Sequence, residues 1–174
     1  IELARMIGRK FNTRFGNLFP EPKPILNRTA RIMSLKDPSQ KMSKSAGAFH
    51  YLALSDPAQT IREKISQAVT DKGPEGGPMS PGTRNLFTLM SEFAGPGTMA
   101  QFEREYYAKT ISYAKMKETL AEAIIKTLEP LQKKRAELLK NQTYLKEVLK
   151  SGAEKLQPIA TETMQEVKKR MGLV

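Results

Sequence analysis

Hydrophobic residues recur at helical spacing from the first residues of the chain onward. Ala4, Ile7, Phe11 and Phe15 line one face of a predicted first helix, which Gly16 ends. No capping residue precedes this pattern, although a helix usually begins with one. We therefore expect the chain to begin inside a helix, as a fragment or a processed product would.

A region with few helical signals follows. Three prolines between residues 20 and 24 exclude a continuous helix there. The apolar pairs Ile25-Leu26 and Ile32-Met33 suit brief strands or ordered loops at the edge of a larger sheet. Since these runs are too few to form a sheet alone, we expect this part of the chain to be incomplete.

Helix signals return near residue 55. Ser55-Asp56-Pro57 predicts a capped start for a helix that ends near Thr70. Seven of the eleven residues from 72 to 82 are Gly or Pro, which predicts a loop. From Thr83 onward the pattern predicts helices only, with a break at Gly95-Pro96-Gly97 and a new helix capped by Thr98.

The apolar pattern predicts three more helices in the last third of the chain. The longest runs from about Tyr113 to Leu139, with Pro130 inside it. A short helix around residues 145–149 is expected to be separated from a final helix by Ser151-Gly152, and Gly172 ends the final helix. This part reads as a self-contained helical domain.

Charge and composition narrow the functional classes. Lys and Arg total 29 against 18 Asp and Glu, a formal net charge of +11, which suits a polyanionic partner such as a nucleic acid. The chain has no cysteine and a single histidine, so disulfides are excluded and a structural metal is not expected. No apolar run approaches the length of a membrane span, so we expect no membrane association.

The stretch with the most specific chemistry is Lys41-Met42-Ser43-Lys44-Ser45, in a segment expected to be a loop. Two lysines and two serines in five residues can bring two ammonium groups and two hydroxyls to one polyphosphate. If pyrophosphate leaves during a reaction, lysines that reach it best at that moment lower the barrier. Most Lys/Ser clusters are solvated basic loops, but this string matches the five-letter KMSKS signature of class I aminoacyl-tRNA synthetases.

The surrounding sequence resembles bacterial tryptophanyl-tRNA synthetases over essentially the whole chain. The run from Ala30 to Pro38 resembles the approach to the signature loop in that family, and Ala68-Val69-Thr70-Asp71 resembles the end of the next helix. Four further stretches resemble landmarks of the family: Ile1 to Arg5, Pro81-Gly82 with Asn85-Leu86, Leu128 to Leu131, and Met171-Gly172-Leu173.

The resemblance implies an ATP site. Residues Lys41, Met42, Ser43, Lys44 and Ser45 would form a mobile loop over the ATP phosphates. Within it, Lys44 would be the main pyrophosphate contact and Lys41 would support it.

A second implied contact is to the adenine, with Ile32 as the first candidate and Met33 as a further one; the alternative for Ile32 is a core residue. The family often has an acidic residue or Asp-Pro after the loop, where this chain has Ala46-Gly47. The departure leaves the hinge chemistry of this loop open.

The resemblance also implies an architecture and an activity. Residues 1–56 would be the last part of a Rossmann-like α/β catalytic domain, and residues 57–174 a helical domain that binds the tRNA anticodon, so that the chain is mainly α. The parent enzyme would join tryptophan to ATP, with Mg²⁺, and transfer it to tRNA(Trp) in the cytoplasm. The tryptophan pocket and most dimer contacts would lie outside this chain, so we expect the chain alone to be inactive.

Two alternatives stay open. One is a non-catalytic, basic helical module that binds RNA, and the other is a tyrosine-specific relative with a similar loop. Residues that bind tRNA are not assigned, because the Lys133-Lys134-Arg135 and Lys168-Lys169-Arg170 triplets could simply be solvated helix faces. Three tyrosines, at positions 106, 107 and 113, could stack on bases but are expected to pack within the protein, and His50 is expected to be structural or exposed.

Overall fold

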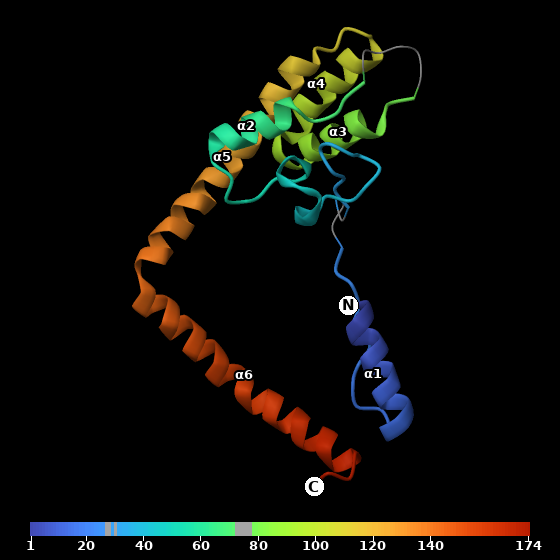
Figure 1. Ribbon diagram of the computed structural model, residues 1–174, viewed down its shortest axis with the longest axis vertical. Helices are drawn as coiled ribbons and strands as arrows, with labels where there is room; N and C mark the ends of the chain where they lie inside the picture. Colours follow the sequence, from blue (N-terminus) through green and yellow to red (C-terminus); the bar gives the residue numbers. More distant parts are fainter. Residues whose placement is uncertain (27–28, 30, 72–77) are drawn as a thin grey trace. The chain divides into compact units, whose positions relative to one another are not determined.

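The computed structural model describes residues 1–26, 29, 31–71 and 78–174, and it is mainly helical as predicted. Its elements follow the order α1 (Glu2–Phe15), η1 (Lys44–Ala46), η2 (Ala48–His50), α2 (Ala58–Ser66), α3 (Pro81–Phe93), α4 (Gly95–Tyr107), α5 (Tyr113–Lys140) and α6 (Gln142–Arg170), where η marks a single turn of 3-10 helix (Figure 1). Most of the predicted Gly/Pro loop, residues 72–77, lies outside the described residues.

Helices α1 to α6 fall into two compact units. One consists of residues 1–26 and 137–174, and the other of residues 27–136. The second unit contains the signature loop and the buried core. A functional boundary between residues 56 and 57 stays a prediction.

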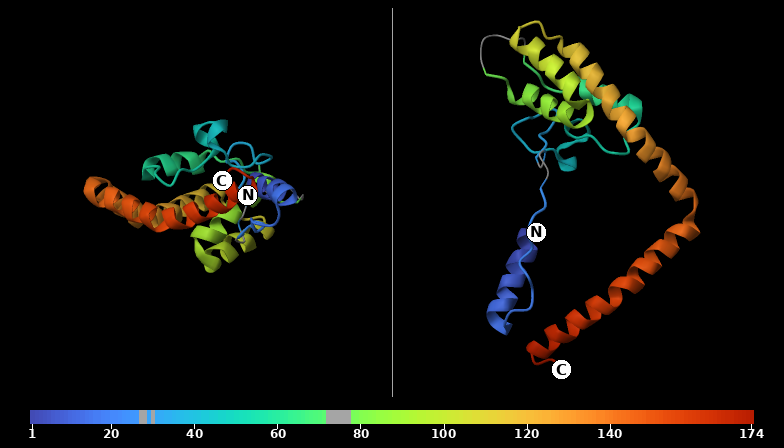
Figure 2. Two further views of the ribbon diagram at one scale, coloured as in Figure 1. Left: turned by 90° about the horizontal axis from the view of Figure 1, so that it is seen from below. Right: turned by 180° about the vertical axis from the view of Figure 1, so that it is seen from behind.

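The core of the second unit lies among α3, α4 and the first half of α5, which run side by side in Figures 1 and 2. Leu86, Met90, Met116, Leu120 and Ile124 are at most 1% exposed. Their spacing on α3 and α5 is the helical spacing seen in the sequence, and burying these faces supplies the main driving force for packing.

Helix α2 packs against α5 through both apolar and polar contacts. Ile61 and Ile65 are fully buried and form the inner face of this helix. The Lys117 ammonium of α5 donates hydrogen bonds to the carbonyl oxygens of Ser66 (3.0 Å), the last residue of α2, and of Ala68 (2.7 Å), two residues further on. Because these carbonyls have no partner within the helix, Lys117 acts as a cap from the neighbouring helix.

The start of α3 is fixed by a cap and by a close backbone approach. The Ser80 hydroxyl accepts a hydrogen bond from the Thr83 amide, and Pro81 occupies the first turn. At Gly82 a Cβ atom would lie 2.3 Å from the Val69 carbonyl oxygen, so only glycine fits there. The helix therefore begins two residues before the predicted Thr83.

Two predicted helix starts are wrong in detail. Helix α2 has Pro57 at its cap position, and no side chain caps it. Instead the Asp56 carboxylate accepts hydrogen bonds from the Ala53 amide and from the buried Lys64 ammonium (2.7 Å). An ion pair of this kind competes with capping for the same oxygens.

The predicted break at Gly95-Pro96-Gly97 is displaced by one residue. The chain turns at Ala94, and Gly95 with a φ of 78° begins α4, so that Pro96 lies in its first turn and Thr98 is not the cap. Proline is compatible with a first turn because its missing amide has no partner there in any case.

Helix α6 is a further correction, because one helix of 29 residues replaces the two that were predicted. Ser151 and Gly152 lie inside it. A single glycine costs a helix only about 1 kcal/mol relative to alanine, and the flanking Lys, Glu, Leu and Ala residues favour continuation. Asn141 caps its start by accepting a hydrogen bond from the Tyr144 amide.

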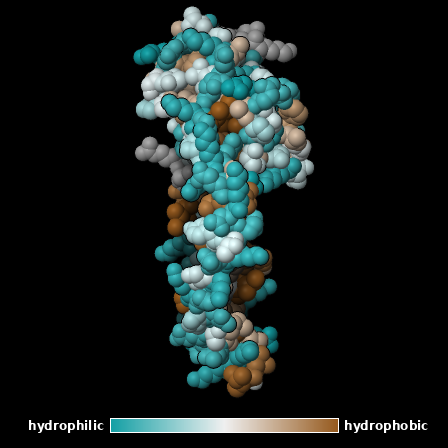
Figure 3. All heavy atoms as spheres, turned by 90° about the vertical axis from the view of Figure 1, so that its left-hand side faces the viewer, coloured by the Kyte–Doolittle hydropathy of each residue, from teal (hydrophilic) through white to brown (hydrophobic). Residues whose placement is uncertain are grey.

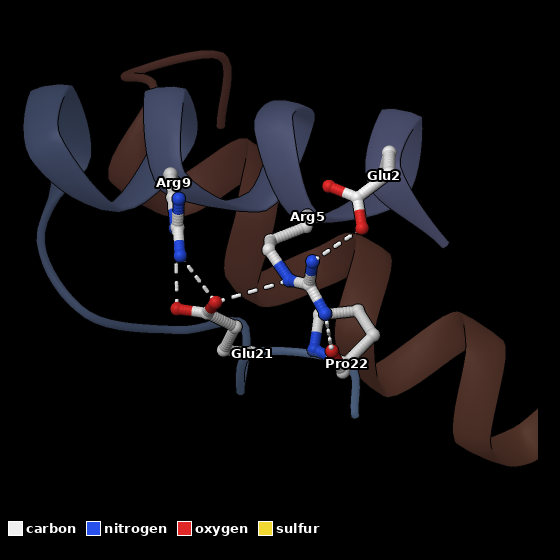
Figure 4. Close-up of polar contacts among 5 residues, drawn as sticks. All are labelled: Glu2, Arg5, Arg9, Glu21 and Pro22. Atoms are coloured by element: carbon white, nitrogen blue, oxygen red, sulfur yellow. Dashed lines mark hydrogen bonds and ion pairs between the residues drawn. The ribbon is translucent and has the colours of Figure 1, made fainter. Parts of the chain in front are cut away.

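The first unit is held together by polar contacts and by the rings of Phe11, Phe15 and Phe19, with the Phe11 centre 5.1 Å from each of the other two. The Glu21 carboxylate pairs with Arg5 and Arg9 of α1, and Arg5 also donates to the Pro22 carbonyl oxygen at 2.9 Å (Figure 4). Arg170 of α6 donates to the Asn17 carbonyl oxygen at 2.9 Å. These contacts fold the segment after α1 back onto the helix.

Helix α6 contributes no buried residue, in contrast to α5. Leu149, Leu156 and Ile159 are all more than 60% exposed. Hydrophobic surface is visible in brown in Figure 3 over the part of the molecule that carries α1 and α6.

Candidate functional site

The signature residues Lys41–Ser45, here called the lysine loop, begin on a short backbone pairing. Lys41 forms an isolated antiparallel bridge with Met33, and the Met42 amide donates to the Ile32 carbonyl oxygen at 3.0 Å. The Ser34 amide donates to the Gln40 carbonyl oxygen at 2.9 Å. The predicted nucleotide contacts Ile32 and Met33 therefore lie directly beside the start of the lysine loop.

The bridge partner of Lys41 is itself fixed to the helical core. The Asn85 side chain on α3 accepts a hydrogen bond from the Met33 amide (3.0 Å) and donates one to the Met33 carbonyl oxygen (2.8 Å). Asn85 is 4% exposed, so its buried side-chain amide has a hydrogen-bond partner for both its oxygen and its nitrogen. A buried residue of α3 thus sets the position of the strand-like segment on which the loop starts.

Apolar side chains add to this support. Ile32 and Met42 are half-buried and pack against the core cluster, and Leu35 is fully buried within it. The Val69 amide donates to the Leu35 carbonyl oxygen at 2.9 Å. Met42 is accordingly an apolar contact that holds the loop to the core, as expected from its chemistry.

The two lysines point their charge into solvent. Lys41 and Lys44 are exposed, and neither has an ion-pair partner among the residues that the structure describes. The Ser43 and Ser45 hydroxyls lie 2.8 Å apart and form a hydrogen bond. Two cationic donors and two hydroxyls are therefore available on one short turn, without a carboxylate that would neutralise them.

The loop ends on glycine in an unusual conformation. Lys44–Ala46 form the single turn η1, which Gly47 ends with a φ of 115°. Side chains rarely adopt this φ, so glycine is required where the family often has a different pair of residues. The Gly47 amide donates to the Lys44 carbonyl oxygen at 3.3 Å.

His50, just beyond the loop, is structural as predicted. Its Nδ1 atom lies 2.9 Å from the Ser34 hydroxyl, and its carbonyl oxygen accepts a hydrogen bond from the Leu35 amide at 3.2 Å. The pKa of the neighbouring Asp37 carboxyl is lowered, chiefly because the Ser39 hydroxyl and amide donate hydrogen bonds to it, with the Gln40 side chain as a further donor.

The residues considered for tRNA contacts differ in their exposure and in their partners. Tyr106 is buried in the core and Tyr113 is half-buried with its hydroxyl on Asp71, as expected for packing residues. Tyr107 is 77% exposed, and its ring packs edge-on against that of Tyr106 with the ring centres 5.6 Å apart, so it lies on the helix surface and not in the core. In the two basic triplets, Lys133 pairs with Glu129 and Arg170 pairs with Glu166, each one helical turn away.

Sequence reasoning missed two supporting residues of the loop. Asn85 was noted only as part of a family landmark, and Ser34 only as part of a matching run. A polar residue at a buried helix position is the signal that could have identified Asn85, because buried polar groups need partners. Ser34 carries no such signal, since it lies in a segment without helical periodicity.

The described residues contain no group of three or more His, Cys, Asp or Glu side chains placed to hold a metal ion. No helix in the described part of the chain is both long and apolar enough to cross a membrane.

Comparison with protein families gives one match that covers most of the chain. Residues 1–129 match the family of class I tRNA synthetases for tryptophan and tyrosine (W and Y). The chain is 38% identical over 180 residues to the tryptophan–tRNA ligase of Clostridium tetani and 40% identical over 179 residues to that of Caldanaerobacter subterraneus subsp. tengcongensis. Each alignment covers all of this chain but only 52% and 53% of those proteins, so the chain spans about half their length.

Solved structures give the same result. The tryptophanyl-tRNA synthetase of Mycoplasma pneumoniae matches with a TM-score of 0.79 at 28% identity, over 99% of this chain and 53% of that one. The enzyme of Campylobacter jejuni complexed with ADP and tryptophan matches with a TM-score of 0.71 at 28% identity, with the same coverage. The resemblance inferred from the lysine loop and its surroundings is confirmed.

Proposed function

This chain belongs to the class I tRNA synthetases of the tryptophan and tyrosine type, and we propose that it is the C-terminal part of a tryptophan–tRNA ligase. The parent enzyme would activate tryptophan with ATP, giving tryptophanyl-adenylate and pyrophosphate, and transfer the tryptophan to tRNA(Trp). The tryptophan-specific relatives favour this substrate over tyrosine. One relative of known structure was solved with ADP and tryptophan, which supports the same pair of ligands here.

The observation that carries the proposal is the state of the lysine loop. Lys41 and Lys44 are exposed and without a carboxylate partner in the described part of the chain, while the backbone at the start of the loop is tied to a buried helix. An exposed ammonium on a supported turn can move a short distance to meet a polyphosphate. Such a group stabilises the negative charge that develops on departing pyrophosphate.

We assign roles within this site as follows. Lys44 would contact the leaving pyrophosphate, Lys41 would support it, and Ser43 and Ser45 would donate hydroxyl hydrogen bonds to the phosphates. Met42 would position the loop against the core, and Ile32 would lie against the adenine. Mg²⁺ would be held chiefly by the ATP phosphates and water, since that ion commonly binds in this way.

The remaining parts of the proposal follow from family membership. Residues 1–56 would complete the catalytic domain around the lysine loop, and residues 57–174 would bind the tRNA anticodon. The tryptophan pocket and most of the dimer contacts would lie in the half of the relatives that this chain does not span. We therefore propose that the enzyme works in the cytoplasm as a dimer and that this chain alone has no synthetase activity.

The test is tryptophan-dependent exchange of pyrophosphate into ATP by the full-length protein, with tyrosine as the control substrate. Lys44→Ala should lower kcat by roughly 10²- to 10³-fold, the usual effect of removing one donor to a developing charge. Tryptophan binding should change little, because the lysine loop does not contact the amino acid in this proposal.

Lys115→Ala, an exposed lysine on α5, is the matched control and should retain the wild-type rate. If neither amino acid drives exchange, the tryptophan-ligase proposal is wrong. The basic charge of the chain would then favour the RNA-binding module, which binding of tRNA without any exchange activity would identify.

A further inference from the structure

The far end of the lysine loop is closed by a hydrogen bond between two side chains that no role in the proposed reaction explains. The Ser34 hydroxyl and His50 Nδ1 are 2.9 Å apart. Their hydrogen bond joins the two ends of residues 34–50, a segment that contains the lysine loop, η1 and η2. We propose that Ser34 and His50 form a positioning pair that holds the lysine loop where Lys44 can reach the leaving phosphates. This inference rests on the proposed function for its catalytic consequence, but the pair itself is a feature of the fold.

The hydrogen-bond inventory shows why the pair is specific. The Ser34 hydroxyl oxygen already accepts a hydrogen bond from the Asp37 amide at 3.1 Å. The hydroxyl keeps one proton and a second lone pair, so it donates to Nδ1 when the ring proton is on Nε2 and accepts from Nδ1 in the other tautomer. Because Ser34 is 0% exposed, loss of the ring leaves a buried hydroxyl without this partner.

The chain between the loop and His50 has little support of its own. Ala46, Gly47, Ala48 and Phe49 are all exposed. The backbone hydrogen bonds in this stretch are local, from the Ala46 amide to Ser43, from the Gly47 amide to Lys44 and from the His50 amide to the Gly47 carbonyl oxygen (3.1 Å). The Lys36 ammonium lies 5.8 Å from the centre of the Phe49 ring, and the hydrogen bonds that tie this end of the loop to the rest of the unit are made by His50.

The two ends of the loop are consequently held in different ways. The start is fixed at Met33 by the buried Asn85, through two hydrogen bonds to backbone. The end is fixed at His50 by one side-chain bond and by the Leu35 amide. Between these two ends, Gly47 has a φ of 115° and no side chain that restricts the backbone at that position.

The expected consequence is on rate rather than on binding. Lys44 contacts the phosphates most strongly in the transition state, so a loop whose end is loose loses transition-state contacts first. A misplacement of about 1 Å can cost on the order of 10²-fold in rate. Ser34 and His50 do not touch substrate in this proposal and act through the position of the loop.

The experiment compares three variants of His50 in the full-length enzyme. In His50→Asn the amide oxygen lies close to the former Nδ1 position and can accept from Ser34, whereas in His50→Gln the amide group lies where Nε2 was. We expect His50→Ala and His50→Gln to lower the kcat of pyrophosphate exchange by about 10- to 10²-fold at unchanged KM for tryptophan, and His50→Asn to restore most of the rate.

Hydrogen exchange gives a readout that does not depend on activity. In His50→Ala the amides of residues 43–50 should exchange faster than in the wild type, while those of α5 should be unchanged. If the wild-type enzyme shows no pyrophosphate exchange, the proposed function fails, and this measurement still decides whether the pair holds the loop.

A double variant separates a shared role from two independent ones. Ser34→Ala combined with His50→Ala should be no slower than the slower single variant, because both remove the same bond. The proposal is overturned if the two losses multiply, if the loop amides of His50→Ala exchange at the wild-type rate, or if His50→Asn is as impaired as His50→Gln.

Discussion

The lysine loop and the helical core belong to the same compact unit but are stabilised by different means. In the core, residues such as Leu120 and Ile124 are at most 1% exposed and are held by apolar packing on several sides. In the lysine loop, Lys41 and Lys44 are exposed, and the position of the backbone depends on a few hydrogen bonds at its two ends. The core resists displacement, whereas the side chains of Lys41 and Lys44 can move without loss of buried area.

This difference indicates how stability and chemistry are divided. A group that must meet a substrate during a reaction gains from mobility, and its removal should leave the fold intact. A buried apolar residue does the reverse, since its loss destabilises the fold and leaves the chemistry of the folded molecules unchanged. Substitution of a residue that contacts both regions should therefore change both stability and catalytic rate.

The largest effect on stability is expected for Leu120→Ala in the core. Leu120 is 0% exposed, and truncation of a buried leucine costs about 2–5 kcal/mol in free energy of unfolding. Urea unfolding of the full-length protein measures this loss. Lys126→Ala, on the exposed side of the same helix, is the control and should change stability by about 0.5 kcal/mol or less.

The same variant also tests whether stability and catalytic rate depend on different residues. Well below its unfolding transition, Leu120→Ala should keep the wild-type kcat for pyrophosphate exchange. A large loss of kcat in fully folded Leu120→Ala would show that the core and the loop are not separate.

Asn85→Ala should affect both regions, because Asn85 is the core residue that fixes the bridge partner of Lys41. Loss of its two hydrogen bonds leaves the Met33 amide and carbonyl without their buried partner, at a cost of about 1–3 kcal/mol. The Met42 amide, which depends on the same pairing, should exchange with solvent faster.

Arg84 is the exposed neighbour of Asn85 on α3, and Arg84→Ala is the matched control. It should change neither the free energy of unfolding nor the exchange rate of the Met42 amide appreciably. If Asn85→Ala lowers stability but the Met42 amide keeps its protection, then the loop is positioned by other contacts, and the link to α3 is only structural.

The contrast between the helical core and the lysine loop also explains which parts of the fold the sequence could predict. Helical periodicity identified the buried faces of α2, α3 and α5, because one-sided burial leaves a regular pattern of apolar residues. It failed at Ser151-Gly152 in α6 and at Gly95, where a local breaker was weighed without the residues that surround it in space. Propensity is a weak signal that neighbouring residues can override.

The site was predictable in a different way. The identity of the lysine loop came from a string of letters and its resemblance to a family, whereas its support by Asn85 depends on a contact across 52 residues of sequence. The pair of Ser34 and His50 spans 16 residues and has no periodic signature. Contacts of this kind are set by the folded chain, so a single sequence does not reveal them.

The smallest effect is expected at Tyr113, a polar contact on the edge of the core. Its hydroxyl lies 3.1 Å from an oxygen of the Asp71 carboxylate, to which it donates a hydrogen bond. Burial raises the pKa of Tyr113 to about 12, a hydrogen bond with Thr83 opposes this in part, and the charge and hydrogen bond of Asp71 add to the rise. Tyr113→Phe should therefore cost about 0.5–1.5 kcal/mol at neutral pH.

The pH dependence of that loss has a definite sign. Because the pKa of the folded state lies above the ordinary value of about 10, the contribution of Tyr113 is fully present below pH 10 and is lost as the pH rises toward 12. Stability measured on both proteins across this range should show the deficit of Tyr113→Phe narrowing, since titration of the lysines is common to both. Tyr107→Phe, at a ring that is 77% exposed, should show no deficit at neutral pH. A deficit at Tyr113 that stayed constant to the top of the range would mean that the tyrosine ionises as easily in the folded protein as in the unfolded chain, and that this edge of the core is as open to solvent as the lysine loop.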